Sequence, residues 1–93
     1  MKAKKAAEAL TLENIPNVGK AVAKDLRAIG ISKPAQLKGR DGLALYRKLN
    51  QVTGMRHDPC MADTLMAATD FMSGGPARPW WEFTARRKKL LKE

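Results

Sequence analysis

Apolar residues recur at one-turn spacing along three stretches of the chain, which is typical of helices that bury one face. No stretch alternates apolar and polar residues for long enough to predict a strand. The pattern therefore predicts an all-α fold, a small bundle of four to five short helices. The three apolar stripes are Ala21, Val22, Leu26 and Ile29 after Gly19; Leu45, Leu49 and Val52 after Asp41; and Met61, Leu65, Ala68 and Met72 after Pro59.

Residues that favour helix ends separate these stripes. Asp41 is placed to cap the second helix, and Asp58 precedes Pro59 as an N-cap precedes a proline in the first helical turn. Gly30 and Gly54 follow the first two stripes, where a left-handed backbone commonly ends a helix. These residues predict where the helices begin and end.

A tight hairpin is predicted just before the first stripe. Pro16 stops the preceding turn, and Asn17 is one of the few non-glycine residues that tolerates a positive φ. Val18 can point into the core, and Gly19 allows another backbone to come close. The N–H groups that start the next helix, together with its dipole, favour a bound anion. Phosphate contact and a purely structural hairpin are both compatible with this pattern.

Cationic side chains follow the hairpin at helical spacing. Lys20, Lys24 and Arg27 could place positive charge beside a bound phosphate, whereas Asp25 opposes them. These three residues therefore join the hairpin in the predicted binding site.

The hairpin resembles the helix-hairpin-helix motif over residues 12–31. That motif usually reads proline, glycine, an aliphatic residue and glycine, with a small alanine four residues later. Pro16, Asn17, Val18, Gly19 and Ala23 occupy these places, and Asn17 departs from the usual glycine. The resemblance implies that backbone N–H groups bind DNA phosphate without reading its sequence, although the Asn17 side chain could obstruct a close approach.

A wider resemblance covers nearly all of residues 12–88. The chain is similar to the small bacterial pathogenicity-locus helix-hairpin-helix proteins, some of which are labelled mitomycin-resistance-like. Its first half also resembles the C-terminal domain of bacterial competence regulators. The resemblance implies a fold and a bacterial origin but no established activity. The blocks that carry it are residues 15–19, Leu26-Arg27, Gly30-Ile31, residues 37–41, residues 45–49, residues 53–60 and residues 76–84.

Length and charge agree with a small nucleic-acid-binding domain. The chain has 93 residues, 44% of them hydrophobic, and its formal net charge is +9, most of it near the two ends. Basic ends suit a DNA or RNA partner, although solvated basic tails would look the same. We expect a basic N-terminal segment at residues 1–10, a helical domain at 11–75, and a Pro/Trp segment with a basic tail at 76–93. With no membrane-spanning run or secretory signal in the sequence, a cytoplasmic location is expected.

The only histidine and the only cysteine lie close together, at His57 and Cys60. A structural zinc needs four ligands, more than this cluster offers, and a reactive pair would need an activated thiol. We favour a cap at Asp58, with Cys60 as a small buried or half-buried hydrophobe. No catalytic residue, metal ligand or cofactor site is predicted, and an enzyme is not expected.

The last segment combines aromatic and basic residues. Two glycines and two prolines predict an extended stretch over residues 74–79. Trp80, Trp81 and Phe83 then follow, either as a clamp on the helical body or as a stacking surface for bases. Thr84 could cap a basic helix over residues 85–92, which an anionic partner could be needed to stabilise.

The sequence is compatible with two functions. One is sequence-nonspecific binding of a DNA or RNA backbone, and the other is a protein-interaction module; the oligomeric state is left open. The residues predicted to bind nucleic acid are Asn17, Val18, Gly19, Lys20, Lys24, Arg27, Arg86, Arg87, Lys88 and Lys89.

Overall fold

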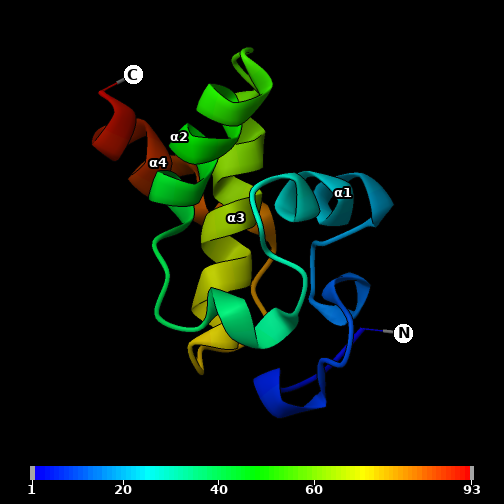
Figure 1. The fold of residues 1–93 in the computed structure, drawn as a ribbon. Helices are drawn as coiled ribbons and strands as arrows, with labels where there is room; N and C mark the ends of the chain where they lie inside the picture. The colour runs from blue at the N-terminus through cyan, green and yellow to red at the C-terminus, as the bar shows by residue number, and fades with distance from the viewer. Residues whose placement is uncertain (1, 93) are drawn as a thin grey trace.

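A computed structural model describes residues 2–92, and these form α-helices joined by 3-10 turns, with no strand among them (Figure 1). The all-α prediction is confirmed. The helices are α1 (Lys20–Ala28), α2 (Gly42–Thr53), α3 (Pro59–Met72) and α4 (Thr84–Leu91), and the 3-10 turns are η1 (Ala6–Glu8), η2 (Leu12–Asn14), η3 (Pro34–Leu37) and η4 (Trp80–Phe83).

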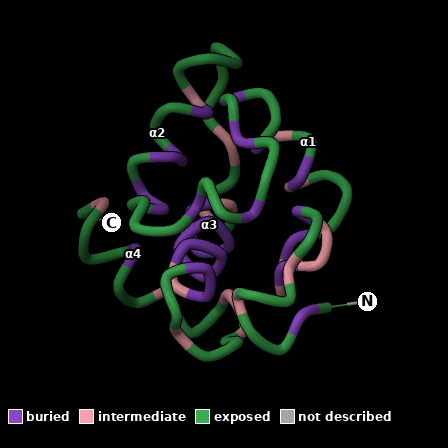
Figure 2. Tube along the Cα trace, turned by 60° about the horizontal axis from the view of Figure 1, so that its bottom comes forward, coloured by how far each residue is buried: buried purple, intermediate pink, exposed green. Residues whose placement is uncertain are grey.

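Helix α3 is the centre of the fold. It lies between α4 and α1, and the tube in Figure 2 shows α3 itself as largely buried, with further buried residues on α1 and α2. Most of its residues are apolar, which suits a helix that is covered all round. The fully buried side chains include Leu65 and Phe71 from α3, Leu45 and Leu49 from α2, and Leu26 from α1. One contiguous core therefore joins three helices.

The predicted helix ends are confirmed. The Asp41 carboxylate accepts a hydrogen bond from the Leu43 N–H at 2.9 Å, and Asp58 caps α3 in the same way. Gly30 and Gly54 have φ values of 88° and 70° after α1 and α2. These ends were predictable because each depends only on residues that are neighbours in sequence.

Gly42 allows α2 to pack closely against α3, a role that the turn-like sequence around it does not indicate. It is the first residue of α2 and is buried against α3, where an added Cβ would lie 2.5 Å from the Met66 backbone. The two helices can come this close only because residue 42 has no side chain.

The basic N-terminal segment, expected over residues 1–10, packs against the helical body. Ala3 is buried, and its N–H donates to the Asn14 carbonyl at 2.7 Å. Met1, the first residue of that segment, and Glu93, the last residue of the basic tail, lie outside the described residues.

The C-terminal segment, expected over residues 76–93, is also attached to the body. Phe83 is buried with Met66 of α3, and Asp63 of α3 bonds both Thr84 and Arg87. Thr84 was expected to cap the last helix, but its hydroxyl donates to Asp63 at 2.7 Å and Phe83 is the N-cap residue. The anionic group that holds this basic helix in place is therefore an aspartate of the chain itself.

None of the helices formed by residues 2–92 is long and apolar enough to cross a membrane.

Candidate nucleic-acid interface

The hairpin loop, residues 15–19, has the backbone that its sequence predicts. The Val18 N–H donates to the Ile15 carbonyl at 3.1 Å, which closes a tight turn around Pro16 and Asn17. Asn17 adopts a positive φ of 72°, as expected. Ile15 and Val18 are fully buried, so two apolar side chains fix the loop to the core.

The N-terminus of α1 opens directly from this loop. Gly19 is the N-cap residue, and no side chain of the described residues caps the helix there. The first hydrogen bond of the helix runs from the Ala23 N–H to the Gly19 carbonyl at 3.0 Å. The N–H groups of residues 20–22 precede this bond and are directed out of the helix end, where the helix dipole favours an anion.

Gly19 is not required by the fold. Its φ of −93° and ψ of −171° are available to any residue, and a Cβ placed there would meet no atom within 4 Å. The residue is exposed. A missing side chain at this position leaves open space in front of the N–H groups of α1.

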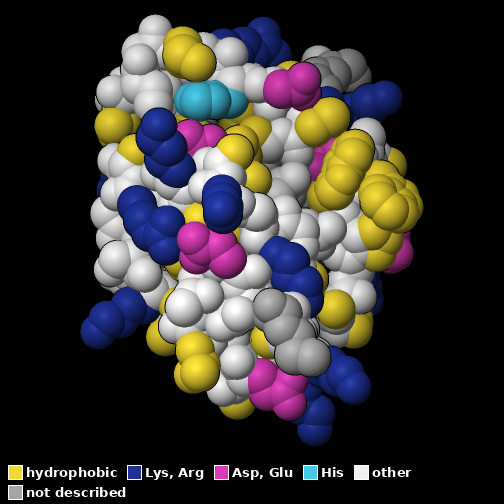
Figure 3. Space-filling model, turned by 90° about the vertical axis from the view of Figure 1, so that its right-hand side faces the viewer, with side chains coloured by type: hydrophobic (Ala, Val, Ile, Leu, Met, Phe, Trp, Pro, Cys, Tyr) yellow, Lys and Arg dark blue, Asp and Glu magenta, His cyan; other side chains and the backbone are white. Residues whose placement is uncertain are grey.

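Two exposed lysines lie on the first turns of this helix. Lys20 and Lys24 are exposed one helical turn apart, and neither forms an ion pair with a described residue. Figure 3, which shows the side of the molecule that lies to the right in Figure 1, has Lys and Arg side chains spread over this face.

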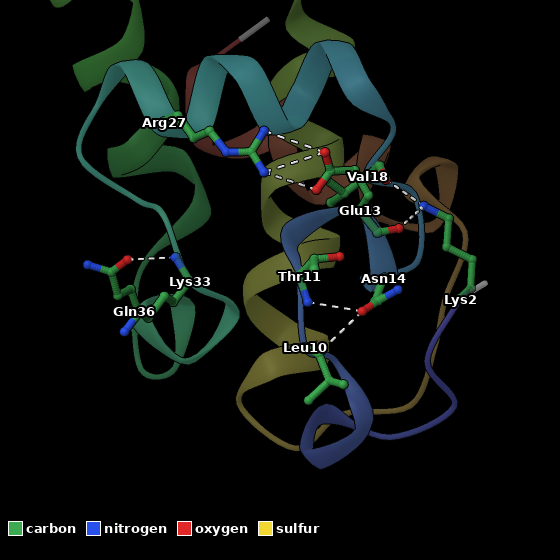
Figure 4. A network of polar contacts seen from close by, with 9 residues as sticks. All are labelled: Lys2, Leu10, Thr11, Glu13, Asn14, Val18, Arg27, Lys33 and Gln36. Atoms are coloured by element: carbon green, nitrogen blue, oxygen red, sulfur yellow. Dashed lines mark hydrogen bonds and ion pairs between the residues drawn. The ribbon is translucent and has the colours of Figure 1, made fainter.

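Arg27, predicted to join these lysines, has a competing partner. Its guanidinium forms an exposed ion pair with Glu13 of η2 at 3.1 Å (Figure 4). The hydrogen bond from Arg27 lowers the pKa of the Glu13 carboxyl. Part of the positive charge of Arg27 is therefore balanced within the protein.

Lys2 contacts the hairpin loop, and the sequence did not predict this contact. Its ammonium group donates to the carbonyl oxygens of Glu13 at 2.8 Å and Ile15 at 3.1 Å, and also to that of Val18 (Figure 4). These three carbonyls converge on one cation behind the loop. Because all three acceptors are backbone atoms, no sequence pattern distinguishes Lys2 from the neighbouring lysines.

The side chain of Asn17 connects the hairpin loop to the C-terminal segment. Its Nδ2 donates to the Arg78 carbonyl at 2.7 Å, and its Oδ1 accepts from the Trp80 N–H at 3.3 Å. The asparagine that departs from the usual glycine of the motif thus has a contact that glycine could not make. The aromatic turn η4 is consequently attached to the hairpin loop.

The two tryptophans of η4 differ in exposure. Trp80 is half-buried, whereas Trp81 is 62% exposed. Their rings meet edge to face, with centroids 5.7 Å apart and planes at 84°. The fully buried aromatic of this segment is Phe83, which fastens η4 to α3.

Arg87, predicted to bind nucleic acid, is instead buried in an ion pair within the protein. Its Nε donates to Asp63 at 2.8 Å, and both side chains are almost completely buried. A guanidinium held inside the protein by its own carboxylate is not available to a phosphate.

The other predicted residues of the basic tail are exposed but lie away from the hairpin loop. Arg86, Lys88 and Lys89 are on the surface of α4. Figures 1 and 2 place α4 and α1 on opposite sides of α3. The predicted site is therefore two separate basic surfaces, and α4 adds charge at a distance from the α1 end.

One expectation for the segment that holds His57 and Cys60 is wrong. Cys60 was expected to be buried or half-buried, but it is exposed beside the Asp58 cap. The hydrogen bond from the thiol to the Asp58 carboxylate raises the pKa of Cys60. Within residues 2–92 no three His, Cys, Asp or Glu side chains are grouped as metal ligands would be.

These features define a small all-α protein with an exposed, uncapped helix N-terminus among lysines. The chain belongs to the family described as Pathogenicity locus, whose sequence model matches residues 5–89. It is 48% identical over 80 residues to the mitomycin resistance protein McrB of Streptomyces lavendulae, covering 86% of this chain and 76% of that protein. No solved structure matches the chain. The expected resemblance to the bacterial pathogenicity-locus proteins, with its mitomycin-resistance-like label, is confirmed.

Proposed function

We propose that this protein is a non-enzymatic, cytoplasmic domain that binds the backbone of nucleic acid, in the first place DNA, without reading its sequence. The N–H groups at the start of α1 bind one phosphate, and Lys20 and Lys24 bind its neighbours. Arg86, Lys88 and Lys89 on α4 add attraction at longer range.

The observation that supports this proposal most strongly is Gly19. Neither its backbone angles nor the space around it requires a glycine, yet it leaves the N–H groups of an uncapped helix accessible among exposed lysines. An approaching phosphate is the ligand that such N–H groups and charges suit. The hairpin loop is held rigid by Ile15 and Val18, so binding does not require the loop to become ordered.

The expected affinity is modest. Nonspecific binding to DNA typically has dissociation constants of about 10⁻⁴ to 10⁻⁶ M at physiological salt, and it depends on how many phosphates are neutralised. Because Arg87 is buried and Arg27 is paired with Glu13, fewer cations are available than the net charge suggests. A steep loss of affinity with added salt is expected all the same.

Gly19→Asp tests the proposal by separating stability from binding. An aspartate at the N-cap accepts hydrogen bonds from the N–H groups of α1, so it should stabilise the protein by about a few tenths of a kcal/mol. The same carboxylate occupies the proposed phosphate position and should lower DNA affinity at least about tenfold, more than one added charge far away would. Gln51→Glu is the matched control, since it adds the same charge on the exposed surface of α2.

The measurement is fluorescence anisotropy with labelled DNA at two salt concentrations, together with thermal unfolding. The proposal predicts that Gly19→Asp is at least as stable as the unmodified protein but binds poorly, whereas Gln51→Glu binds nearly normally. If both variants bind equally well, the α1 end is not the phosphate site. If the unmodified protein does not bind DNA or RNA at all, the alternative of a protein-interaction module replaces this proposal.

A further inference from the structure

We infer that Trp81 stacks on an unpaired base of the bound nucleic acid, so that the ligand class is single-stranded rather than fully duplex. This inference rests on the proposed function, because it extends the phosphate site at α1 to the neighbouring aromatic turn. It assigns a ligand to the largest exposed aromatic side chain of the chain.

The exposure of Trp81 is unusual for its size. An indole is among the largest apolar groups of a protein, and burial of such a side chain normally stabilises the fold. Trp81 nevertheless has 62% of its surface exposed, while Trp80 beside it is half-buried. Figure 3 shows hydrophobic side chains gathered at one edge of the face over which the Lys and Arg side chains spread.

The position of Trp81 is fixed from both sides. On one side, the Trp80 N–H and the Arg78 carbonyl are bonded to Asn17 of the hairpin loop. On the other side, Phe83 is buried against α3. The edge of one indole also meets the face of the other, with the two ring centroids 5.7 Å apart. The exposed ring is thus held in place before any ligand arrives, which lowers the entropy lost on binding.

Trp81 directly follows Trp80, whose backbone N–H is bonded to Asn17 of the hairpin loop. A nucleic-acid strand that gives a phosphate to the α1 end can therefore direct a base toward η4. Exposed Arg78 adds a cation on the same segment, whereas Glu82 disfavours a phosphate next to Trp81. The distribution of charge therefore favours a phosphate beside the hairpin loop and an uncharged base beside the Trp81 indole.

The chemistry favours an unpaired base. Every base has a π-face that stacks on an aromatic side chain, and this contact does not depend on sequence. In a duplex those faces are already covered by neighbouring base pairs, so an indole cannot reach them without unstacking a step. Trp81 should therefore contribute to the binding of single strands and not to that of an intact duplex.

The experiment compares Trp81→Ala, Trp81→Phe and Met55→Ala with the unmodified protein, each titrated with a thymidine oligonucleotide and with a blunt duplex of equal phosphate number. Met55 is a matched control because it is also apolar and 59% exposed, on the loop after α2. Circular dichroism establishes that each variant is folded. Trp81→Ala should weaken single-strand binding about 5- to 100-fold, with Trp81→Phe in between and Met55→Ala unchanged.

Binding of the duplex should be the same for all four proteins. Quenching of tryptophan fluorescence by the single strand should largely disappear in Trp81→Phe. Equal single-strand affinity of Trp81→Ala and the unmodified protein, both still sensitive to Gly19→Asp, would overturn the stacking inference alone. If the unmodified protein binds neither oligonucleotide, both the inference and the proposed function are wrong, and Trp81 is then a candidate contact for a protein.

Discussion

At the scale of single residues, Asp63 links the C-terminal segment to α3. It is fully buried on α3 and accepts hydrogen bonds from Thr84 and Arg87. A buried carboxylate is tolerated only when its charge is paired and its oxygens are bonded, and here two residues, 21 and 24 positions away, meet that need together. Because partners so far apart share no local pattern, the sequence indicated a basic helix but not its internal anion.

Replacing Asp63 should therefore destabilise the protein strongly. Asp63→Asn removes the charge of the carboxylate that pairs with Arg87 inside the protein, and breaking a buried ion pair costs about 3–5 kcal/mol in comparable cases. Urea unfolding followed by circular dichroism measures this change. The double variant Asp63→Leu with Arg87→Met removes both charges and should recover most of the lost stability; a single variant as stable as the unmodified protein would contradict the assigned ion pair.

Gly42 and Gly19 make a matched pair for testing the structure. Gly42→Ala places a Cβ 2.5 Å from the backbone of α3 and should cost about 1–3 kcal/mol in the free energy of unfolding. Gly19→Ala meets open space with an ordinary φ and should change stability much less. Equal losses of stability in the two variants would show that α2 and α3 are not as close as described.

At the scale of elements, the sequence predicted the helices, which depend on neighbouring residues. It did not predict the contacts between segments that lie far apart in the chain. The stripe from Ala21 to Ile29 and the cap at Asp41 predicted α1 and the start of α2, because helices follow from neighbouring residues. The link between Asn17 and Trp80 spans 63 positions and left no such signal. The same holds for Lys2, whose partners are carbonyl oxygens of η2 and of the hairpin loop.

The link from the hairpin loop to η4 predicts the behaviour of Asn17 variants. Asn17→Gly keeps a residue suited to the φ of 72° but loses both side-chain bonds to the C-terminal segment. Amide hydrogen exchange at Trp80 should then accelerate about fivefold or more, as expected for a hydrogen bond worth about 1 kcal/mol. Asn17→Asp keeps the acceptor for the Trp80 N–H and should protect this amide better; identical exchange in all three proteins would contradict the link.

The ion pair between η2 and α1 predicts a pH dependence. Because Arg27 lowers the pKa of Glu13 in the folded protein, the pair stabilises the fold fully above the ordinary glutamate pKa of about 4.3 and loses its effect as the pH falls through the lower folded value. Thermal unfolding of the unmodified protein and Glu13→Gln should thus differ at neutral pH and converge in acid. A difference that stays constant down to the most acidic pH would exclude this pair as its source.

At the scale of the whole molecule, the sequence predicted the amount of charge but not its distribution. The net charge of +9 favours an anionic partner, but the hairpin loop and α4 lie on opposite sides of α3. One predicted cation, Arg87, is inside the protein, and another, Arg27, is shared with Glu13. The family, the all-α class and the hairpin backbone were accessible from sequence, whereas the surface available to a ligand depended on packing.

This distribution predicts that lysines of equal charge contribute unequally. Lys20→Gln removes a cation beside the proposed phosphate position and should weaken DNA binding more than Lys88→Gln, which removes one from α4. Affinities measured by anisotropy at low salt give the comparison, with a difference of about threefold or more expected for a direct contact against a distant one. Equal losses would mean that DNA is attracted by overall charge and not held at α1.

The most direct test of the central claim is an amide NMR titration with DNA at two salt concentrations. If the start of α1 binds phosphate, the largest shift changes should fall on the amides of residues 19–22 and should diminish together as salt rises. If only the amides of α4 respond, or no amide of the hairpin loop moves, the loop is a structural element and the proposed nucleic-acid interface is wrong.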